Sequence, residues 1–534
     1  IIHDYKDVAY ANNQGFHQIS YAQQGEDILA SKYFENQPKG LYALALANTG
    51  ERFGYYTMLA IFVLFLQSNF GWGEGLAGTV YSTFLMLVYF LPIVGGAMAD
   101  KIGYGKCVTF GIIVMFLGYL LLAIPAGAGT LAIVVMSGAL LMICIGTSLF
   151  KGNLQVMVGN LYDDARYSGQ RDSGFSIFYM AINIGALFAP TAALKIIDWA
   201  KTSLGATEQT AYHYAFGVAC ISLILSIAIY YGFRWTFAHV DNSVSEKDFS
   251  VEDKKVETEV DAADTRSRLV ALFLVFAVVV FFWMAFHQNG LTLTYFARDF
   301  VKKSSTGVEG MMFNVTNLVA VIFIIYSLFS LFQSKKIGGK LISVLVILAS
   351  AGYLFYDYSQ LPVSGVEISA PIFQQFNPCF VVALTPISMA LFGWLASKGK
   401  EPSAPRKIGY GMLVAGLGYV VMIMASIGLS YNLTDAQRVS PNWLVSTYLI
   451  LTFAELLLSP MGISFVSKVA PEKYKGLMMG CWFGATAIGN FLVQIPAYLW
   501  KAVPLVYVWG VLVTLCLASF IFIFVVMKKL EKVC

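Results

Sequence analysis

Charged residues are scarce in this chain, and their scarcity excludes most classes of soluble protein. Asp, Glu, Lys and Arg make up 12% of the 534 residues, whereas 58% are hydrophobic. Ordinary soluble domains carry about 25% charged residues. The net charge of +4 is too small, and the basic residues too scattered, to predict a nucleic-acid partner. With a mean hydropathy of +0.68, the composition predicts an integral membrane protein in contact with a lipid bilayer.

Cysteine and catalytic motifs are also sparse. The seven cysteines show no metal-ligand spacing, which predicts free thiols, no disulfides, no metal and no cofactor. We find no nucleophile elbow and no phosphate-binding loop, so the sequence argues against an enzyme. The first forty residues have no basic segment followed by an apolar run, and we expect insertion through the first span rather than a cleaved signal peptide.

Apolar segments of about twenty residues recur along the chain, as an all-α membrane protein requires. Fourteen spans are predicted, near 41–69, 76–98, 107–125, 130–159, 173–197, 211–234, 268–297, 311–333, 341–357, 370–396, 406–430, 441–468, 475–499 and 503–528.

The spans fall into two sets separated by a charged stretch. We predict a polar N-terminal segment at 1–40, a six-helix bundle at 41–234, a cytoplasmic linker at 235–267 and a second bundle at 268–530. The second set holds two spans too many, which predicts an extra helical hairpin at about 311–357 that packs at the periphery or binds a protein partner. Two six-helix bundles with a substrate site between them are a common transporter layout.

Lys and Arg are concentrated in alternate loops. Lys101, Lys106, Arg166 and Arg171 lie in loops on one side of the predicted bilayer, and the opposite loops are poorer in cations. The positive-inside rule therefore predicts cytoplasmic N- and C-termini in a cell (inner) membrane. The compact outside loops favour a bacterial source.

The first span contains an unusual group of polar residues. Glu51 and Arg52 are an expected ion pair, followed by the phenols Tyr55 and Tyr56. At 3.6 residues per turn these side chains share one broad helix face. Because each charge at bilayer depth costs roughly 2.5 to 3.5 kcal/mol on insertion scales, such residues usually face a bundle interior and serve a pathway.

Several ordered segments resemble one family of transporters. The loop after the second span, with Gly95, Gly96, Asp100 and Lys101, resembles the loop motif of the major facilitator superfamily. Within that superfamily the chain is similar to the proton-dependent oligopeptide transporter family, on the motifs Glu51-Arg52-Phe53-x-Tyr55-Tyr56, Phe178-Tyr179-x-x-Ile182-Asn183-x-Gly185, Asn377-Pro378, Glu455-Leu-Leu-Leu-Ser459-Pro460-x-Gly462, Met478-Met479-Gly480-x-Trp482-Phe483 and Gly489-Asn490.

The resemblance implies a major facilitator fold and uptake of di- and tripeptides driven by protons through alternating access. A short peptide is a zwitterion, so its site needs cations, an anion and amide groups. By resemblance, Arg52 and Lys151 bind the peptide carboxylate, and Glu455 with Asn183 and Asn377 binds the ammonium group. The implied cavity walls are Tyr55, Tyr56, Tyr89, Trp283, Trp482 and Phe483.

Each of these residues also has a structural interpretation. Glu51 and Arg52 suit an ion pair that locks helices together, and Lys151 suits a snorkelling cation. Tyr89 and Trp482 suit packing or interfacial anchoring. Asn183 suits a hydrogen bond between helices.

The chain departs from the family pattern at charged positions. Asn48 replaces the family's first glutamate, and Leu59 and His287 replace a basic residue and its usual acidic partner. Glu51 and Glu455 are therefore the carboxylates that we expect to couple protons to transport. His287 is either a further proton sensor or a neutral core histidine. In the expected mechanism, a proton on Glu51 frees Arg52, and the peptide ammonium competes with Lys151 for Glu455.

Two alternatives stay open. A family member that carries nitrate or another small organic anion would suit the reduced carboxylate count and His287, although Glu455 suits an amine better. A non-transporting sensor or assembly subunit would suit the lost carboxylates and the extra hairpin.

Overall fold

The computed structural model describes residues 37–167, 170–240, 262–334, 336–471 and 475–533. Most of the predicted N-terminal segment and linker, together with Lys335 and Cys534, lies outside the described residues. Within the described part, fourteen helices are long and apolar enough to cross a membrane. They confirm the predicted all-α class and the count of fourteen spans, and the chain is a multi-pass membrane protein.

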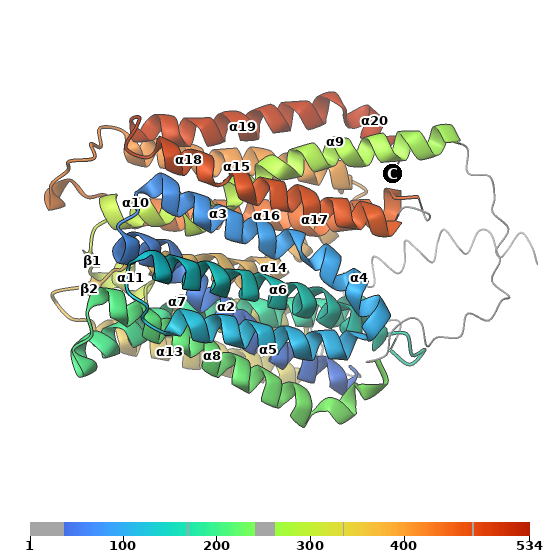
Figure 1. Ribbon diagram of the computed structural model, residues 1–534. Helices are drawn as coiled ribbons and strands as arrows, with labels where there is room; N and C mark the ends of the chain where they lie inside the picture. Colours follow the sequence, from blue (N-terminus) through green and yellow to red (C-terminus); the bar gives the residue numbers. More distant parts are fainter. Residues whose placement is uncertain (1–36, 168–169, 241–261, 335, 472–474, 534) are drawn as a thin grey trace, which may run out of the picture.

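The first six spans form one bundle (Figure 1). Its helices are α2 (Lys39–Phe70), α3 (Glu74–Phe90) continued by α4 (Pro92–Ile102), α5 (Tyr104–Ala123), α6 (Thr130–Asn160), α7 (Arg171–Leu204) and α8 (Glu208–Gly232), followed by the short turns η2 (Arg234–Thr236) and η3 (Ala238–Val240). Helix α2 packs against both α7 and α8, so the predicted polar helix lies inside the bundle.

The remaining eight spans follow. They comprise α9 (Ala262–Phe286) with η5 (His287–Gly290) and α10 (Thr292–Phe300), then α11 (Gly307–Met311), α12 (Val315–Gln333), α13 (Ile337–Ser359), η6 (Ala370–Gln375), α14 (Phe376–Ser397), α15 (Ala404–Ser426), η7 (Asp435–Gln437), α16 (Asn442–Val469), α17 (Lys475–Leu492), α18 (Gln494–Leu499), α19 (Leu505–Val525) and α20 (Met527–Glu531). Two short strands, β1 (Ser304–Ser305) and β2 (Val366–Glu367), pair antiparallel. We call the end of the molecule that carries them the β end (Figure 1).

Glycines permit the tight joint that the sequence predicts after the second span. Gly103 joins α4 to α5 with a φ of 98°, in the left-handed region that favours glycine. Inside α4, a Cβ on Gly95 would lie 2.2 Å from the Ser148 carbonyl oxygen. A larger residue at Gly95 would force α4 away from α6, and one at Gly103 would strain the backbone.

The extra helices α12 and α13 form a hairpin held together by polar groups. Asn317 donates to Asp357 at 2.7 Å, and Ser343 donates to Ser330 at 3.0 Å. Interhelical hydrogen bonds of this kind bring helices together where apolar burial gives no driving force. Helix α12 also contacts α14 of the second bundle and α7 of the first. The domain boundaries and a partner for this hairpin stay predictions.

The two bundles meet along two pairs of surfaces. Helix α3 packs on α17 and α18, and α7 packs on α14 and η6. The helices that carry the predicted site residues therefore surround this junction. The six described cysteines are free thiols, as predicted.

Candidate functional site

The charged pair of the first span is formed and buried. Nε and Nη2 of Arg52 donate to the two carboxylate oxygens of Glu51 at 2.5 and 2.6 Å. The Glu51 side chain is 0% exposed and that of Arg52 is 3% exposed. Consecutive residues of a helix do not normally face each other. Glu51 and Arg52 pair nevertheless, because an unpaired charge at this depth would cost several kcal/mol.

Tyrosines of the same helix complete the surroundings of Arg52. The Arg52 guanidinium lies over the Tyr55 ring, 4.7 Å from its centroid. The rings of Tyr55 and Tyr56 meet edge to face at 5.2 Å. Both bidentate hydrogen bonding and ring contact therefore hold Arg52 in place within the bundle.

Lys151 of α6 is a cation without a carboxylate partner among the residues that the structure describes. Its Nζ lies 4.3 Å from the ring centroid of Tyr89 on α3. A cation over an aromatic face gains about 0.5 to 2 kcal/mol, less than a full counter-ion provides. Lys151 is therefore ready to receive an anion.

Glu455 of α16 is the buried carboxylate of the second bundle. It is 8% exposed and accepts a hydrogen bond from Asn377 Nδ2 at 3.0 Å. Asn377 also donates to the Thr452 hydroxyl at 3.0 Å. No cation pairs with Glu455 within the described ranges, so this carboxylate is held by neutral donors and can accept an ammonium group.

The two ends of the site come from different bundles. Arg52 and Lys151 belong to the first bundle and Glu455 to the second. Tyr56 and Tyr89 lie within electrostatic range of both Arg52 and Glu455. A molecule with opposite charges at its two ends would connect the bundles here.

Several predicted site residues have other partners. Asn183 donates to the Tyr179 carbonyl oxygen of its own helix at 3.0 Å. Trp482 is 2% exposed, and a Cβ on Gly462 would collide with its ring, so Trp482 packs between helices. The expected contact of Lys151 with Glu455 is not formed in this structure.

The remaining aromatic and histidine positions line the bundle junction. His287 stacks on Trp283 with ring centroids 5.1 Å apart and lies 6.0 Å from the Tyr89 ring. Phe483 is half-buried on α17. The rings of Trp283, His287 and Tyr89 therefore adjoin one another, and Tyr89 contacts Lys151.

Sequence reasoning missed Thr452, and it named Tyr179 only as part of a family motif, without a role in the site. Thr452 precedes Glu455 by three residues, a spacing that puts both on one helix face and would have identified it. Tyr179 is 43% exposed and lies close to Glu455. Its carboxylate partner comes from the other bundle, so local sequence carries no signal for this approach.

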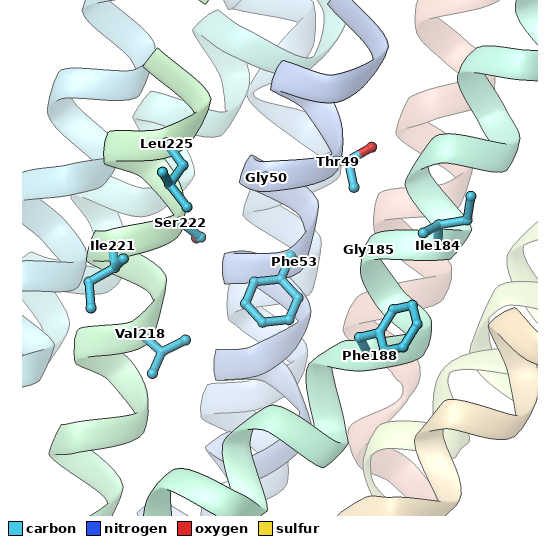
Figure 2. A pocket seen from close by; sticks show the side chains of 10 residues that line it. All are labelled: Thr49, Gly50, Phe53, Ile184, Gly185, Phe188, Val218, Ile221, Ser222 and Leu225. Atoms are coloured by element: carbon cyan, nitrogen blue, oxygen red, sulfur yellow. The ribbon is translucent and has the colours of Figure 1, made fainter. Parts of the chain in front are cut away.

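An apolar crevice of about 390 Å³ lies on the other side of α2 (Figure 2). Phe53, Ile184 and Phe188 are among the side chains that line it. Thr49 and Ser222 are polar side chains that line it. The Thr49 hydroxyl is within hydrogen-bond distance of the carbonyl oxygens of Ala45 and Ala181, and the Ser222 hydroxyl donates to the Ala219 carbonyl oxygen. The crevice offers no charged partner to a zwitterion, and it is separate from the charged site.

Polar contacts join the two bundles at the β end. Glu74 of α3 accepts from Lys501 at 2.7 Å and from Arg298 at 3.3 Å, and Arg298 also donates to Gln67 of α2 at 2.5 Å. Thr79 of α3 donates to Gln494 at 2.8 Å. We call Glu74, Arg298 and Lys501 the β-end latch, because they link the two bundles at this end.

Neutralising the latch is expected to open the β end. Glu74→Gln keeps the shape but removes a charge that two cations share, and hydrogen bonds to charged groups contribute about 1.5 to 3 kcal/mol each. Spin labels at Gln209→Cys and Ala436→Cys, both exposed at the β end, would report the bundle separation by double electron–electron resonance. We expect the population to shift toward longer distances. The ratio of open to closed molecules should change about tenfold for each 1.4 kcal/mol of stabilisation that the substitution removes.

Glu208→Gln is the matched control for the latch. Glu208 begins α8 at the same end and contacts Lys201 of the same bundle at 4.0 Å, with both side chains exposed. Its loss is expected to leave the distances unchanged. Equal distributions in Glu74→Gln and the unmodified protein would show that the latch does not hold the bundles together.

The fold and this site define a class of protein. Fourteen spans in two bundles, with buried and oppositely charged groups at their junction, are the architecture of a membrane transporter. No group of His, Cys, Asp and Glu within the described ranges is arranged to hold a metal ion.

Comparison with known proteins identifies the family. The POT family model matches residues 106–251 and 359–509, more than half of the chain, and the chain belongs to the POT family. It is 28% identical to a di-/tripeptide transporter of Lactococcus lactis subsp. lactis (strain IL1403), over 94% of this chain and 97% of that protein. It is also 28% identical to the peptide transporter YePEPT of Yersinia enterocolitica subsp. palearctica, over 86% of this chain and 87% of that one.

Solved structures show the same fold. A crystal structure of the peptide transporter POT in complex with sulfate superposes with a TM-score of 0.70, at 23% identity, over 97% of this chain and 99% of that chain. A POT family transporter in complex with a thioalcohol-conjugated peptide gives a TM-score of 0.71 at 21% identity, over 96% and 99%. The predicted major facilitator fold and the family resemblance are both confirmed.

Proposed function

We propose that this chain is a proton-coupled symporter that imports di- and tripeptides by alternating access. The names of its relatives, a di-/tripeptide transporter and a peptide transporter, support this cargo. The observation that carries the proposal is that opposite charges lie on opposite bundles, Arg52 and Lys151 on the first and Glu455 on the second, with Tyr56 and Tyr89 within electrostatic range of both Arg52 and Glu455.

A peptide zwitterion fits this arrangement chemically. Its carboxylate would pair with Lys151, and its ammonium group would pair with Glu455, which Asn377 orients. Each charge-assisted contact adds about 1.5 to 3 kcal/mol. Because the contacts come from different bundles, binding would draw the bundles together and favour reorientation.

Proton coupling is proposed to act through Glu51. The carboxylate binds Arg52 through both oxygens, so protonation of Glu51 would remove the acceptor and release the guanidinium to the peptide carboxylate. A proton and a peptide would then enter together. We further propose an inner-membrane location with cytoplasmic termini, in which the β end faces outward and the β-end latch is the closed outer gate.

Uptake into liposomes tests the function directly. The purified full chain, reconstituted with an inward proton gradient, is expected to accumulate labelled dialanine, and a proton ionophore should abolish the accumulation. Nitrate at equal concentration should not compete with dialanine, since it has no ammonium group for Glu455. Gradient-independent equilibration, or competition by nitrate alone, would contradict the proposal.

A further inference from the structure

The apolar crevice beside α2 has an exposed rim. Ile184 and Phe188 of α7 and Ile221 and Leu225 of α8 line the crevice, and all four side chains are exposed. Figure 2 shows Phe53 of α2 between the side chains of these two helices. Because α7 and α8 are long and apolar enough to cross the membrane, an exposed rim in the middle of both helices faces the lipid tails of the bilayer.

The lining of the crevice offers no polar group to a ligand. None of the ten residues that line it is charged. Its two hydroxyl groups are already engaged, that of Thr49 with backbone carbonyl oxygens of α2 and α7 and that of Ser222 with a carbonyl oxygen of its own helix. An occupant is therefore held by van der Waals contact alone, as apolar groups are inside a bilayer.

Aromatic and charged side chains lie on the same two helices nearer the β end. Trp199 of α7 and Tyr214 of α8 are both exposed, and their rings meet edge to face at 6.2 Å. Exposed Trp and Tyr side chains are typical of the level of the lipid headgroups. Lys195 and Asp198 of α7 are exposed beside them, and neither forms an ion pair with a residue that the structure describes.

These side chains and the crevice form one continuous surface. Tyr214, Val218 and Leu225 share a face of α8, because their spacings of four and eleven residues are helical repeats. Lys195 precedes Trp199 by one turn on α7, and Trp199 contacts Tyr214. At 1.5 Å per residue, Leu225 lies about 16 Å from Tyr214 along the axis of α8. Half of a hydrocarbon core is about 15 Å thick, so a lipid tail that starts at the headgroup level reaches the crevice.

We propose that this surface binds one phospholipid with an ethanolamine headgroup, in the leaflet at the β end. Lys195 pairs with its phosphate, Asp198 accepts hydrogen bonds from its ammonium group, and one acyl tail fills the crevice against α2. A cation and an anion three residues apart match a zwitterionic headgroup, and a primary ammonium donates N–H groups that a choline lacks. The tail packs beside Phe53 on the helix that carries Glu51 and Arg52, and so supports that helix.

Two phospholipids with identical acyl tails test the headgroup. Phosphatidylethanolamine and phosphatidylcholine are titrated separately onto the delipidated full chain in detergent, and native mass spectrometry measures the first bound lipid. We expect phosphatidylethanolamine to bind about tenfold more tightly, because a charge-assisted hydrogen bond is lost with choline. Soluble phosphoethanolamine, which has no tails, is expected not to displace the lipid. Equal affinities, or displacement by phosphoethanolamine, would overturn the proposed lipid site.

Substitutions at the two charges assign the preference to them. Asp198→Asn is expected to bring the ratio of the two affinities to within twofold of unity, and Lys195→Gln is expected to weaken both lipids about tenfold. Lys201→Gln and Glu208→Gln are the matched controls, since these residues lie at the same end of α7 and α8 but contact each other at 4.0 Å. Both controls are expected to keep the tenfold ratio. An unchanged ratio in Asp198→Asn would contradict the proposed role of this carboxylate.

A substitution in the crevice tests the tail. Val218→Trp fills the crevice and is expected to weaken both phospholipids about tenfold. Ile224→Trp is the matched control, because Ile224 is exposed on the same helix and does not line the crevice. Unchanged binding in Val218→Trp, or an equal loss in Ile224→Trp, would show that no tail occupies the crevice. Because lipid binding is measured without peptide, these outcomes do not depend on the proposed transport function.

Discussion

Glu455→Gln is expected to lower dialanine uptake by about 10- to 100-fold. The substitution keeps the size of the side chain and the acceptor for Asn377, which donates to the carboxylate at 3.0 Å. It removes the charge that pairs with the peptide ammonium, and a hydrogen bond between charged groups is worth about 1.5 to 3 kcal/mol. The measurement is the concentration dependence of labelled dialanine uptake in liposomes, which we expect to change through weaker binding.

The cargo itself provides the control for Glu455. N-acetyl-dialanine lacks the ammonium group, so the unmodified chain should bind it poorly, and Glu455→Gln should not weaken its binding further. Thr452→Val removes only the hydroxyl that accepts from Asn377, and we expect a two- to fivefold loss. An equal loss for both peptides in Glu455→Gln would show that the carboxylate is structural rather than a partner of the amine.

The sequence predicts the spans well because apolar length decides membrane insertion. The ends and breaks of the helices are less predictable. The second span divides at Leu91 into α3 and α4, and the seventh continues past Phe286 through η5 into α10. Gly290 lies in the second interruption and permits a close contact between segments far apart in sequence, since a Cβ there would lie 1.9 Å from the Tyr81 hydroxyl.

The site follows the same division between local and distant information. The pairing of Glu51 with Arg52 is visible in the sequence because the two residues are adjacent and buried together. The approach of Lys151 to Tyr89, and of Asn490 to His287, depends on how separate helices pack. A family motif marks such residues as a set but does not say which of them touch.

Glu51→Gln is expected to uncouple transport from the proton gradient. Glutamine offers Arg52 one neutral acceptor in place of two carboxylate oxygens at 2.5 and 2.6 Å, so the guanidinium stays available to the peptide at every pH. We expect gradient-driven accumulation of dialanine to fall to the level of equilibration, a loss of more than tenfold. Exchange of external labelled for internal unlabelled dialanine should continue, because exchange needs no net proton movement.

The ion pair of Asp164 with Arg166 provides a control that distinguishes the loss of proton coupling from the loss of an ion pair in general. Oδ2 of Asp164 accepts from Nε and Nη2 of Arg166 at 3.1 and 2.7 Å. The side chain of Asp164 is 39% exposed and that of Arg166 is 76% exposed. Hydrogen bonds from Arg166 lower the pKa of Asp164 to about 2. This carboxylate therefore stays charged between pH 5 and 8 and carries no proton in the transport range, whereas a carrier of the coupled proton must gain and lose one there. Asp164→Asn should therefore leave accumulation and its pH dependence unchanged. If Glu51→Gln still accumulates dialanine against a gradient, the proton is carried elsewhere, and Glu455 becomes the remaining buried carboxylate of the site to test.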